Sequence, residues 1–260
     1  MRPVVLSIAG LDPGGGAGIV ADIKAIEAHG CWAAAVATTL TVQTVARIDD
    51  MHAVPPGLLA AQIDAVFSDH AVAAVKIGLL GNAPAVDAVA DALRGRGIPI
   101  VLDPVCASTS GKQFLDSVAL EHLRARLLPH VDVLTPNREE AVVLAGLPPT
   151  RSEREVADKL LAFGARHVLM TGGASGNGVC EDRLFSAAGV QSIVHRAIPT
   201  DRVHGTGCLH SSGVAARLAR GESVLDAAIG AGRWLERALE CAVAFGCGGA
   251  PDAVAPERGP

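Results

Sequence analysis

Residues 4–18 read VVLSIAGLDPGGGAG, and the expected architecture starts from this stretch. The apolar and small residues 4–9 are typical of a strand that is buried on both faces of a sheet. A turn rich in glycine and proline ends this strand. Residues 17–29 then follow a helical pattern, with Gly30 as the stop signal. A buried strand followed directly by a helix predicts the first unit of a parallel sheet.

The same alternation continues along the 260-residue chain and predicts an α/β fold, with helices on both faces of a mostly parallel sheet. No composition break or repeat divides the chain, so residues 1–260 are expected to form one domain, with residues 246–260 as a flexible tail. The expected strands are residues 4–9, 32–38, 74–77, 99–102, 131–134 and 167–170, with a β-rich patch at 180–185 and 191–197. The expected helices are residues 17–29, 55–68, 83–94, 116–128, 138–145, 153–163, 208–219 and 223–245.

Composition excludes several classes of protein. Half of the residues are hydrophobic and 19% are charged, which suits a folded domain with a large core. The net charge is −5 and there is no basic run, so no nucleic-acid partner is expected. No apolar stretch has the length of a membrane span or of a signal peptide's core. Six cysteines without a regular spacing indicate free thiols in a reducing compartment. We expect a soluble cytoplasmic protein that does not bind membranes.

Ligands of such sheets bind beyond the carboxyl ends of the strands. The glycine-rich and polar segments of this chain follow the expected strands, so this edge is where chemistry is predicted. These segments are residues 10–18, 39–44, 78–82, 103–111, 135–140 and 171–178.

The sharpest motif is HGTGC at residues 204–208, at the start of an expected helix. Glycines let backbone N–H groups turn inward, and a helix N-terminus adds unpaired N–H groups and a positive dipole end. Such a site stabilises the charge of a phosphoryl group during transfer. Cys208 falls in the first turn, where the pKa of a thiol is lowered, and is a candidate general base. The alternative is a glycine turn with a buried capping cysteine.

The second motif is LTPNREE at residues 134–140. Pro136 keeps Thr135 out of helical geometry, so a strand ends and a helix begins here. Asn137 is a good N-cap, and Glu140 stands three positions later, as in a capping box. The same two residues suit Mg²⁺, which prefers oxygen ligands and keeps several waters. The capping and metal interpretations both stay open.

Three weaker signals lie at the same edge. The glycine-rich loop at 14–18, followed by Asp22 one turn into the helix, allows close approach to a flat ligand, although it is neither a P-loop nor GxGxxG. Asp103, before Pro104, places a carboxylate at the end of a strand. Thr171 and the glycine-rich residues 172–178 suit nucleotide phosphates. Simple turns explain each of these equally well.

The order of these motifs resembles that of the hydroxymethylpyrimidine/phosphomethylpyrimidine kinases. The likeness extends from about residue 4 to residue 240. It is carried by SIAG-x-D-x-GGGAGI-x-AD-x-K at 7–24, TLTVQ at 39–43, VKIG at 75–78, VLDPV at 101–105, LTPN-x-x-E at 134–140 and HGTGC at 204–208.

This resemblance implies a ribokinase-like three-layer sandwich that uses ATP with Mg²⁺. The implied reaction, in thiamine biosynthesis, phosphorylates 4-amino-5-hydroxymethyl-2-methylpyrimidine and then its monophosphate. The implied catalytic residues are Cys208 as the base and Gly205, Thr206 and Gly207 as the anion hole. The implied pyrimidine contacts are Gly10, Asp22, Gln43, Leu79 and Cys106. The implied ATP contacts are Asp103, Asn137, Glu140, Thr171 and Gly173, with Asp103 and Glu140 at the metal.

The chain departs from the family pattern at a few positions, namely Leu11, Thr44, Leu79, Cys106 and the pair Leu209-His210. Leu79 and Cys106 stand where methionine is usual, so these departures bear on the choice of substrate. The alternatives are a pyridoxal-type kinase on the same fold, a non-catalytic pyrimidine-binding sensor and a nicotinamide-dependent oxidoreductase. Apolar edge elements make a homodimer an additional expectation.

Overall fold

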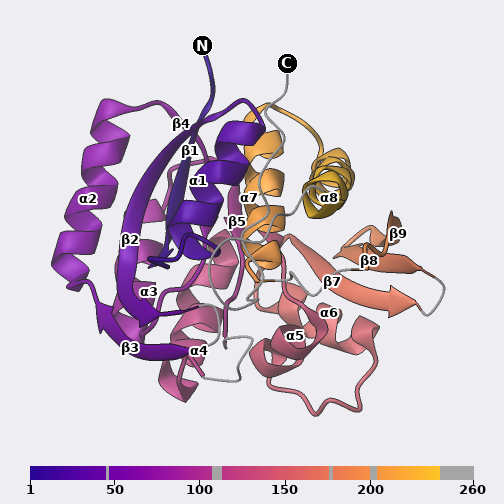
Figure 1. Cartoon of the computed structure of the whole chain (residues 1–260). Coiled ribbons are helices and arrows are strands. Elements are labelled where there is room, and N and C mark those ends of the chain that lie inside the picture. The colour runs from indigo at the N-terminus through magenta and orange to yellow at the C-terminus, as the bar shows by residue number, and fades with distance from the viewer. Residues whose placement is uncertain (45–46, 107–112, 176–177, 200–203, 241–260) are drawn as a thin grey trace.

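A nine-stranded sheet forms the centre of the computed structural model, which describes residues 1–44, 47–106, 113–175, 178–199 and 204–240 (Figure 1). The strand order is β3-β2-β1-β4-β5-β6-β7-β8-β9. All neighbours from β2 to β7 are parallel, whereas β3, β8 and β9 pair antiparallel at the two edges. The strands are β1 Val4–Leu11, β2 Trp32–Gln43, β3 Ile48–Ala53, β4 Val72–Ile77, β5 Ile100–Leu102, β6 Val133–Leu134, β7 His167–Ser175, β8 Val179–Ser186 and β9 Gly189–Arg196.

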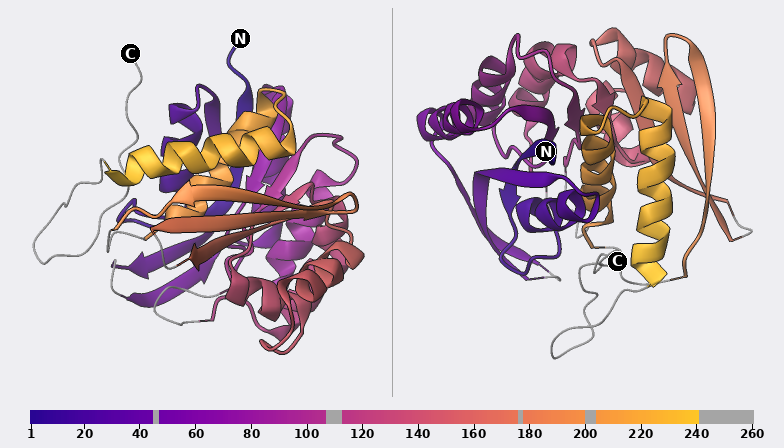
Figure 2. Two further views of the ribbon diagram at one scale, coloured as in Figure 1. Left: turned by 90° about the vertical axis from the view of Figure 1, so that its right-hand side faces the viewer. Right: turned by 90° about the horizontal axis from the view of Figure 1, so that it is seen from above.

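Helices cover both faces of the sheet, so the predicted α/β sandwich is confirmed (Figures 1 and 2). One face carries α1 Gly18–Ala28, α7 Thr206–Ala219 and α8 Val224–Glu240. The other carries α2 Pro56–Asp69, α3 Ala83–Leu93, α4 Ser117–His122, α5 Arg138–Ala145 and α6 Glu153–Ala162. One wide turn at Leu123–Leu127 and a short 3-10 turn at Leu128–His130 extend α4. No helix within the described residues is long and apolar enough to cross a membrane.

Alternation along the strands divides the core into two layers. In β1, Leu6 and Ile8 pack with α2 and α3, while Val5 packs with α1 and α7. In β4, Val75 belongs to the first layer and Ala74 to the second. Successive residues of a strand point to opposite faces, so each parallel strand contributes to both layers. Position 76 therefore faces the layer that contains α1 and α7, although it is a lysine.

The second strand differs from the expectation. The sequence interpretation ended it at residue 38 and treated residues 39–44 as a turn. In the structure β2 continues to Gln43 and pairs with β3, a strand that was not predicted. β-Branched residues at 39, 41 and 42 favour the extension. The charged pair Asp49-Asp50 concealed β3, which is an edge strand with both aspartates exposed.

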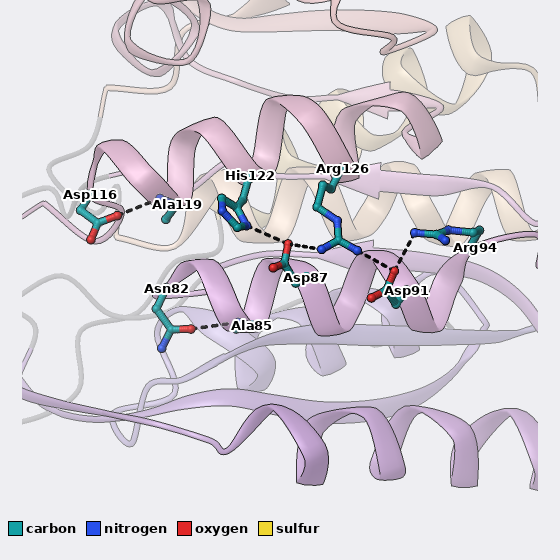
Figure 3. A network of polar contacts seen from close by, with 9 residues as sticks. All are labelled: Asn82, Ala85, Asp87, Asp91, Arg94, Asp116, Ala119, His122 and Arg126. Atoms are coloured by element: carbon teal, nitrogen blue, oxygen red, sulfur yellow. Dashed lines mark hydrogen bonds and ion pairs between the residues drawn. The ribbon is translucent and has the colours of Figure 1, made fainter.

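Surface ion pairs join α3 to the helical segment that follows α4 (Figure 3). Arg126 bridges Asp87 and Asp91 at 3.0 and 2.8 Å, and His122 also contacts Asp87. Asn82 and Asp116 cap the two helices through backbone N–H groups of Ala85 and Ala119. Exposed pairs of this kind contribute at most about 1 kcal/mol each. They orient the helices, and the buried layers provide most of the stability.

His29 lies buried where α1 ends against α8. Its ring lies 4.8 Å from the indole of Trp234, and its Nδ1 donates to the carbonyl oxygen of Ala25. Burial lowers the pKa of His29 to about 4, and nearby arginines add to this effect. The folded protein therefore binds this proton less readily than the unfolded chain, whose histidine has a pKa near 6.5.

The His29 contribution to stability is therefore complete above pH 6.5 and is lost progressively as the pH falls toward 4. At pH 5 we expect the free energy of unfolding to be about 2 kcal/mol lower through this residue alone. Urea denaturation of the wild type and of His29→Gln between pH 5 and 7 measures the effect. The free energy of unfolding should depend less on pH in His29→Gln than in the wild type. An equal pH dependence in the two proteins would contradict this account.

Candidate active site

The sheet order brings the predicted site residues into one row. Parallel strands place their carboxyl ends along the same edge. Along this edge the structure places six predicted residues in the order Gln43 at the end of β2, Gly10 in β1, Leu79 after β4, Asp103 after β5, Asn137 after β6 and Thr171 in β7. The sheet thus makes neighbours of residues as distant in the sequence as Gly10 and Leu79.

The N-terminus of α7 faces this row, and its start is fixed by a close backbone contact. Gly205 precedes α7 with a φ of +76°, a conformation that favours glycine. An ideal Cβ on Gly205 would lie 1.9 Å from the carbonyl oxygen of Gly16, so no side chain fits there. The Gly205 carbonyl accepts the N–H of Leu209. The N–H groups of Thr206, Gly207 and Cys208 belong to the first turn, where helices bind anions.

Cys208 lies between the first turn of α1 and Asp103. The backbone N–H of Gly18 donates to its sulfur, and its thiol donates to the Asp103 carboxylate. The sequence argument predicted a lowered thiol pKa, and this prediction is wrong. The pKa of Cys208 is raised to about 12, mainly by burial; the charge of Lys76 lowers it, and the charges of Asp103 and Asp22 raise it. In the unliganded protein Cys208 is a protonated thiol.

Asp12 and His204 connect the glycine-rich loop after β1 to the anion-binding turn. Asp12 accepts the N–H groups of Gly14 and Ala17 at 2.8 and 2.9 Å. Its second oxygen lies 3.1 Å from Nε2 of His204. The side chain of Gln43 also donates to Asp12, and these hydrogen bonds lower the Asp12 pKa although burial, the largest influence, raises it. Asp12 and His204 were not among the predicted site residues.

Three of the predicted pyrimidine contacts, Gly10, Leu79 and Cys106, lie at or beyond the carboxyl ends of β1, β4 and β5. An ideal Cβ on Gly10 would lie 2.9 Å from Cδ2 of Leu79, so these two predicted residues are in contact. Cys106 is buried beyond β5, and burial raises the pKa of its thiol to about 12. The contacts of these residues with a substrate stay predictions.

Asn137 and Glu140 form a complete capping box at the start of α5. The Asn137 side chain accepts the N–H of Glu140, and the Glu140 carboxylate accepts the N–H of Asn137. The pKa of Glu140 is raised to about 7, mainly by burial and then by the Asp103 carboxyl. The backbone N–H groups of Asn137 and Cys106 have the opposite effect and lower this pKa. The capping interpretation is confirmed, and the electrostatic coupling to Asp103 leaves the metal interpretation open.

Asp103 and Glu140 provide two partly desolvated carboxyl groups at this edge, and such groups suit a hard divalent cation. Oxygen ligands and retained waters are what Mg²⁺ prefers. Within the described residues no three His, Cys, Asp or Glu side chains form a metal-binding group. The pair Asp103 and Glu140 would suit a magnesium ion that keeps several waters and binds phosphates as its other ligands.

Thr171 and Gly173 lie in β7 at the end of the row. The N–H of Thr171 donates to the carbonyl oxygen of Pro136, which brings Thr171 beside Asn137. Gly173 pairs with Glu181 of β8. Residues 176 and 177 of the predicted phosphate loop lie outside the described residues. The ATP contacts of Thr171 and Gly173 stay predictions.

Asp22 lies inside the protein and is hydrogen-bonded to other buried side chains. Its carboxylate is fully buried and accepts hydrogen bonds from Ser7, Lys76 and Ser212. Both oxygens of the carboxylate thus already have internal partners. Direct contact of Asp22 with the pyrimidine stays a prediction. Lys76 was missed as a site residue, although a single lysine in the apolar strand 72–77 was a usable signal.

An α/β sandwich with an anion-binding helix start and carboxylates at the carboxyl edge defines a ribokinase-like small-molecule kinase. A model of the phosphomethylpyrimidine kinase family matches residues 12–252. The chain belongs to this family, as the resemblance implied.

Relatives agree with this assignment. The chain is 40% identical over 238 residues to the hydroxymethylpyrimidine/phosphomethylpyrimidine kinase of Salmonella typhimurium, with 90% of both chains covered. It is 41% identical over 256 residues to the thiamine biosynthesis multifunctional protein ThiED of Corynebacterium glutamicum. The match covers 96% of this chain and 33% of ThiED, so the chain spans about a third of that protein.

Solved structures share the fold. An ADP complex of Bacillus subtilis pyridoxal kinase superposes with a TM-score of 0.88 at 26% identity, covering 99% of both chains. Phosphomethylpyrimidine kinase from Clostridium difficile gives a TM-score of 0.79 at 29% identity, covering 92% of this chain and 100% of the other. The fold is thus common to pyridoxal and pyrimidine kinases.

Proposed function

We propose that this chain transfers the γ-phosphoryl group of ATP to the hydroxymethyl group of 4-amino-5-hydroxymethyl-2-methylpyrimidine, and then phosphorylates the monophosphate, as part of thiamine biosynthesis. The observation that carries this proposal is the position of Cys208. It lies in the anion-binding turn, beside Gly18 on the substrate side and Asp103 on the nucleotide side. Full-length likeness to kinases named for these two substrates supports the same reaction.

In the proposed mechanism, the N–H groups of residues 206–208 stabilise the charge on the transferring phosphoryl group. Gly10, Leu79 and Gln43 hold the pyrimidine so that its hydroxymethyl group faces Cys208. Asp103 and Glu140 would hold Mg²⁺, which would neutralise phosphate charge when bound. Phosphoryl transfer passes through a loose transition state, so the hydroxyl group need not lose its proton in advance. The Cys208 thiol donates to the Asp103 carboxylate, so its own proton passes to Asp103 as the sulfur takes the proton of the hydroxymethyl group late in the transfer.

Three further expectations belong to this proposal. A net charge of −5 supports the absence of a nucleic-acid partner. A biosynthetic kinase with free thiols fits the cytoplasm. Leu40 and Val42 of β2 are exposed, which supports a homodimer through the β2-β3 edge, and sedimentation equilibrium would determine the oligomeric state.

Pyridoxal phosphorylation is the second candidate function. The likeness to the Bacillus subtilis pyridoxal kinase covers the whole chain. Leu79, in contact with Gly10, stands where the resemblance implies methionine, so the substrate side differs from the family pattern.

ADP production by the purified protein with Mg-ATP tests both candidates. The hydroxymethylpyrimidine, its monophosphate and pyridoxal are offered separately. ADP with both pyrimidines is the expected result. ADP with the monophosphate alone restricts the proposal to the second step, and ADP with pyridoxal alone replaces it by the second candidate. Ligand binding without ADP would indicate the non-catalytic sensor.

A further inference from the structure

A charged group lies where the second core layer is otherwise apolar. Lys76 and Asp22 form an ion pair of 2.7 Å between Nζ and Oδ1, and neither side chain has any exposed surface. Ser7 donates to the other carboxylate oxygen at 2.6 Å, and Ser212 donates to Oδ1 at 2.8 Å. We call Ser7, Asp22, Lys76 and Ser212 the buried hub.

The hub joins four elements that are distant in sequence. Ser7 comes from β1, Asp22 from α1, Lys76 from β4 and Ser212 from α7. Ser7 and Lys76 are paired residues of neighbouring strands, so their side chains point to the same face. All four side chains are fully buried, so solvent does not screen the ion pair.

Stability alone does not explain such a pair. Two buried charges lose their hydration, and apolar residues of similar volume are often equally stable in the same place. The surroundings here are Ala74, Val101 and Val133, which belong to the same apolar layer. A buried pair that adds little net stability has another use, and the positions of its partners indicate which one.

Ser212 connects the hub to the proposed catalytic helix. It stands four residues after Cys208, so both side chains lie on one face of α7. Its neighbour Ser211 donates to Asp103 at 3.1 Å, with the carbonyl oxygens of Gly207 and Cys208 also within hydrogen-bond distance. Two consecutive serines therefore connect the second turn of α7 to Asp22 and to Asp103.

Lys76 connects the hub to the substrate side. Its Nζ lies 2.9 Å from the position of an ideal Cβ on Gly78, directly under the turn that leads to Leu79. Burial is the largest influence on the pKa of Lys76 and lowers it, but the charges of Asp22 and Asp103 raise it more, so the ammonium group stays charged.

We propose that Lys76 and Ser212 are positioning residues for Cys208: through Asp22 they hold the first two turns of α7, and with them the anion-binding turn, at a fixed place relative to β1 and β4. The inference rests on the proposed kinase reaction. Transfer between bound groups is sensitive to displacement, and an error of 1 Å can cost about 100-fold in rate.

Ser212→Ala is the first test, since Ser212 lies outside the row of predicted site residues and its described side-chain hydrogen bond is to Asp22. We expect kcat to fall about 10-fold or more, with KM for ATP within about twofold of the wild type. Arg126→Ala is the control, because Arg126 lies in the surface network of Figure 3, and its kcat should not change. An unchanged kcat in Ser212→Ala would overturn the inference.

Hydrogen exchange gives a readout that does not depend on activity. The amide of Leu209, which closes the first turn of α7, should exchange faster in Ser212→Ala by at least about tenfold, with amides of β5 and β6 unchanged. Unchanged exchange at Leu209 would also overturn the inference. If the wild type makes no ADP with any of the three substrates, the proposed function fails. The hydrogen-exchange measurement at Leu209 then decides alone whether the buried hub holds α7 in place.

The charge pair is tested by Lys76→Met alone and together with Asp22→Asn. The single variant leaves a buried carboxylate without a cation, and its Tm should fall by about 10 °C. The double variant removes both charges, and its Tm should recover most of this loss while kcat stays at least about tenfold low. Recovery of kcat together with Tm would make the hub purely structural. A higher KM for the pyrimidine at normal kcat would make Asp22 a substrate contact instead, and either result overturns the inference.

Discussion

Replacing Cys208 with alanine should lower kcat by about 10²- to 10⁴-fold, which is the usual contribution of a positioned general base. The sulfur accepts the N–H of Gly18 and contacts Asp103, so no other described thiol occupies a comparable position. ATP binding should change little, since the predicted nucleotide contacts lie in other turns. ADP release at saturating pyrimidine measures kcat, and calorimetric titration with ATP measures binding.

Cys180→Ala provides the matched control for this variant. Cys180 is a half-buried free thiol in β8, away from the row of site residues, and its loss should leave kcat unchanged. Normal turnover in Cys208→Ala would remove Cys208 from the base role. The proton would then leave by another group or through water, and the anion-binding turn would carry the catalysis.

Replacing Gly205 with alanine should lower kcat by about 10²- to 10³-fold, the loss seen when a donor to a developing charge is displaced. A methyl group there would lie 1.9 Å from the Gly16 carbonyl oxygen, so the loop after β1 and the start of α7 must separate. The movement carries the N–H groups of residues 206–208 away from the phosphoryl group. Steady-state kinetics with the pyrimidine and with ATP measure the effect.

Gly221→Ala separates backbone strain from this collision. Gly221 has a φ of +86°, close to that of Gly205, but no atom lies within 4 Å of its ideal Cβ. We expect Gly221→Ala to lower the free energy of unfolding by about 1 kcal/mol and to leave kcat unchanged. If both variants lose only stability, the close packing of Gly205 on Gly16 has no catalytic role.

Much of the fold follows from local patterns. The apolar runs and helical periods predicted the six parallel strands and their helices, because the central strands β1, β4, β5 and β6 are buried on both faces and read as apolar. Asn137 and Glu140 gave their capping box directly, since the spacing that satisfies two N–H groups is local. The β3 strand was missed because Asp49 and Asp50 suit an exposed edge and disrupt the apolar pattern.

The sequence predicted which residues lie together at this edge of the sheet and did not predict their electrostatics. Motif order identified Cys208, Asp103 and Gly205, which the structure brings together. The thiol pKa was predicted in the wrong direction, because the atoms that desolvate Cys208 come from segments almost 200 residues away. The partners of Asp22 were equally hidden, since Ser212 and Lys76 meet it only through the tertiary fold.

The contacts that close the site join residues that are far apart in the sequence. Asp12 meets His204 across 192 positions, and Asp22 meets Ser212 across 190. During synthesis the first strands and α1 leave the ribosome long before α7 exists. A nascent chain therefore has no anion-binding turn and leaves the Asp22–Lys76 pair without its serine from α7. Neither nucleotide nor pyrimidine can aid folding through this site until α7 has emerged, so early intermediates depend on the apolar layers.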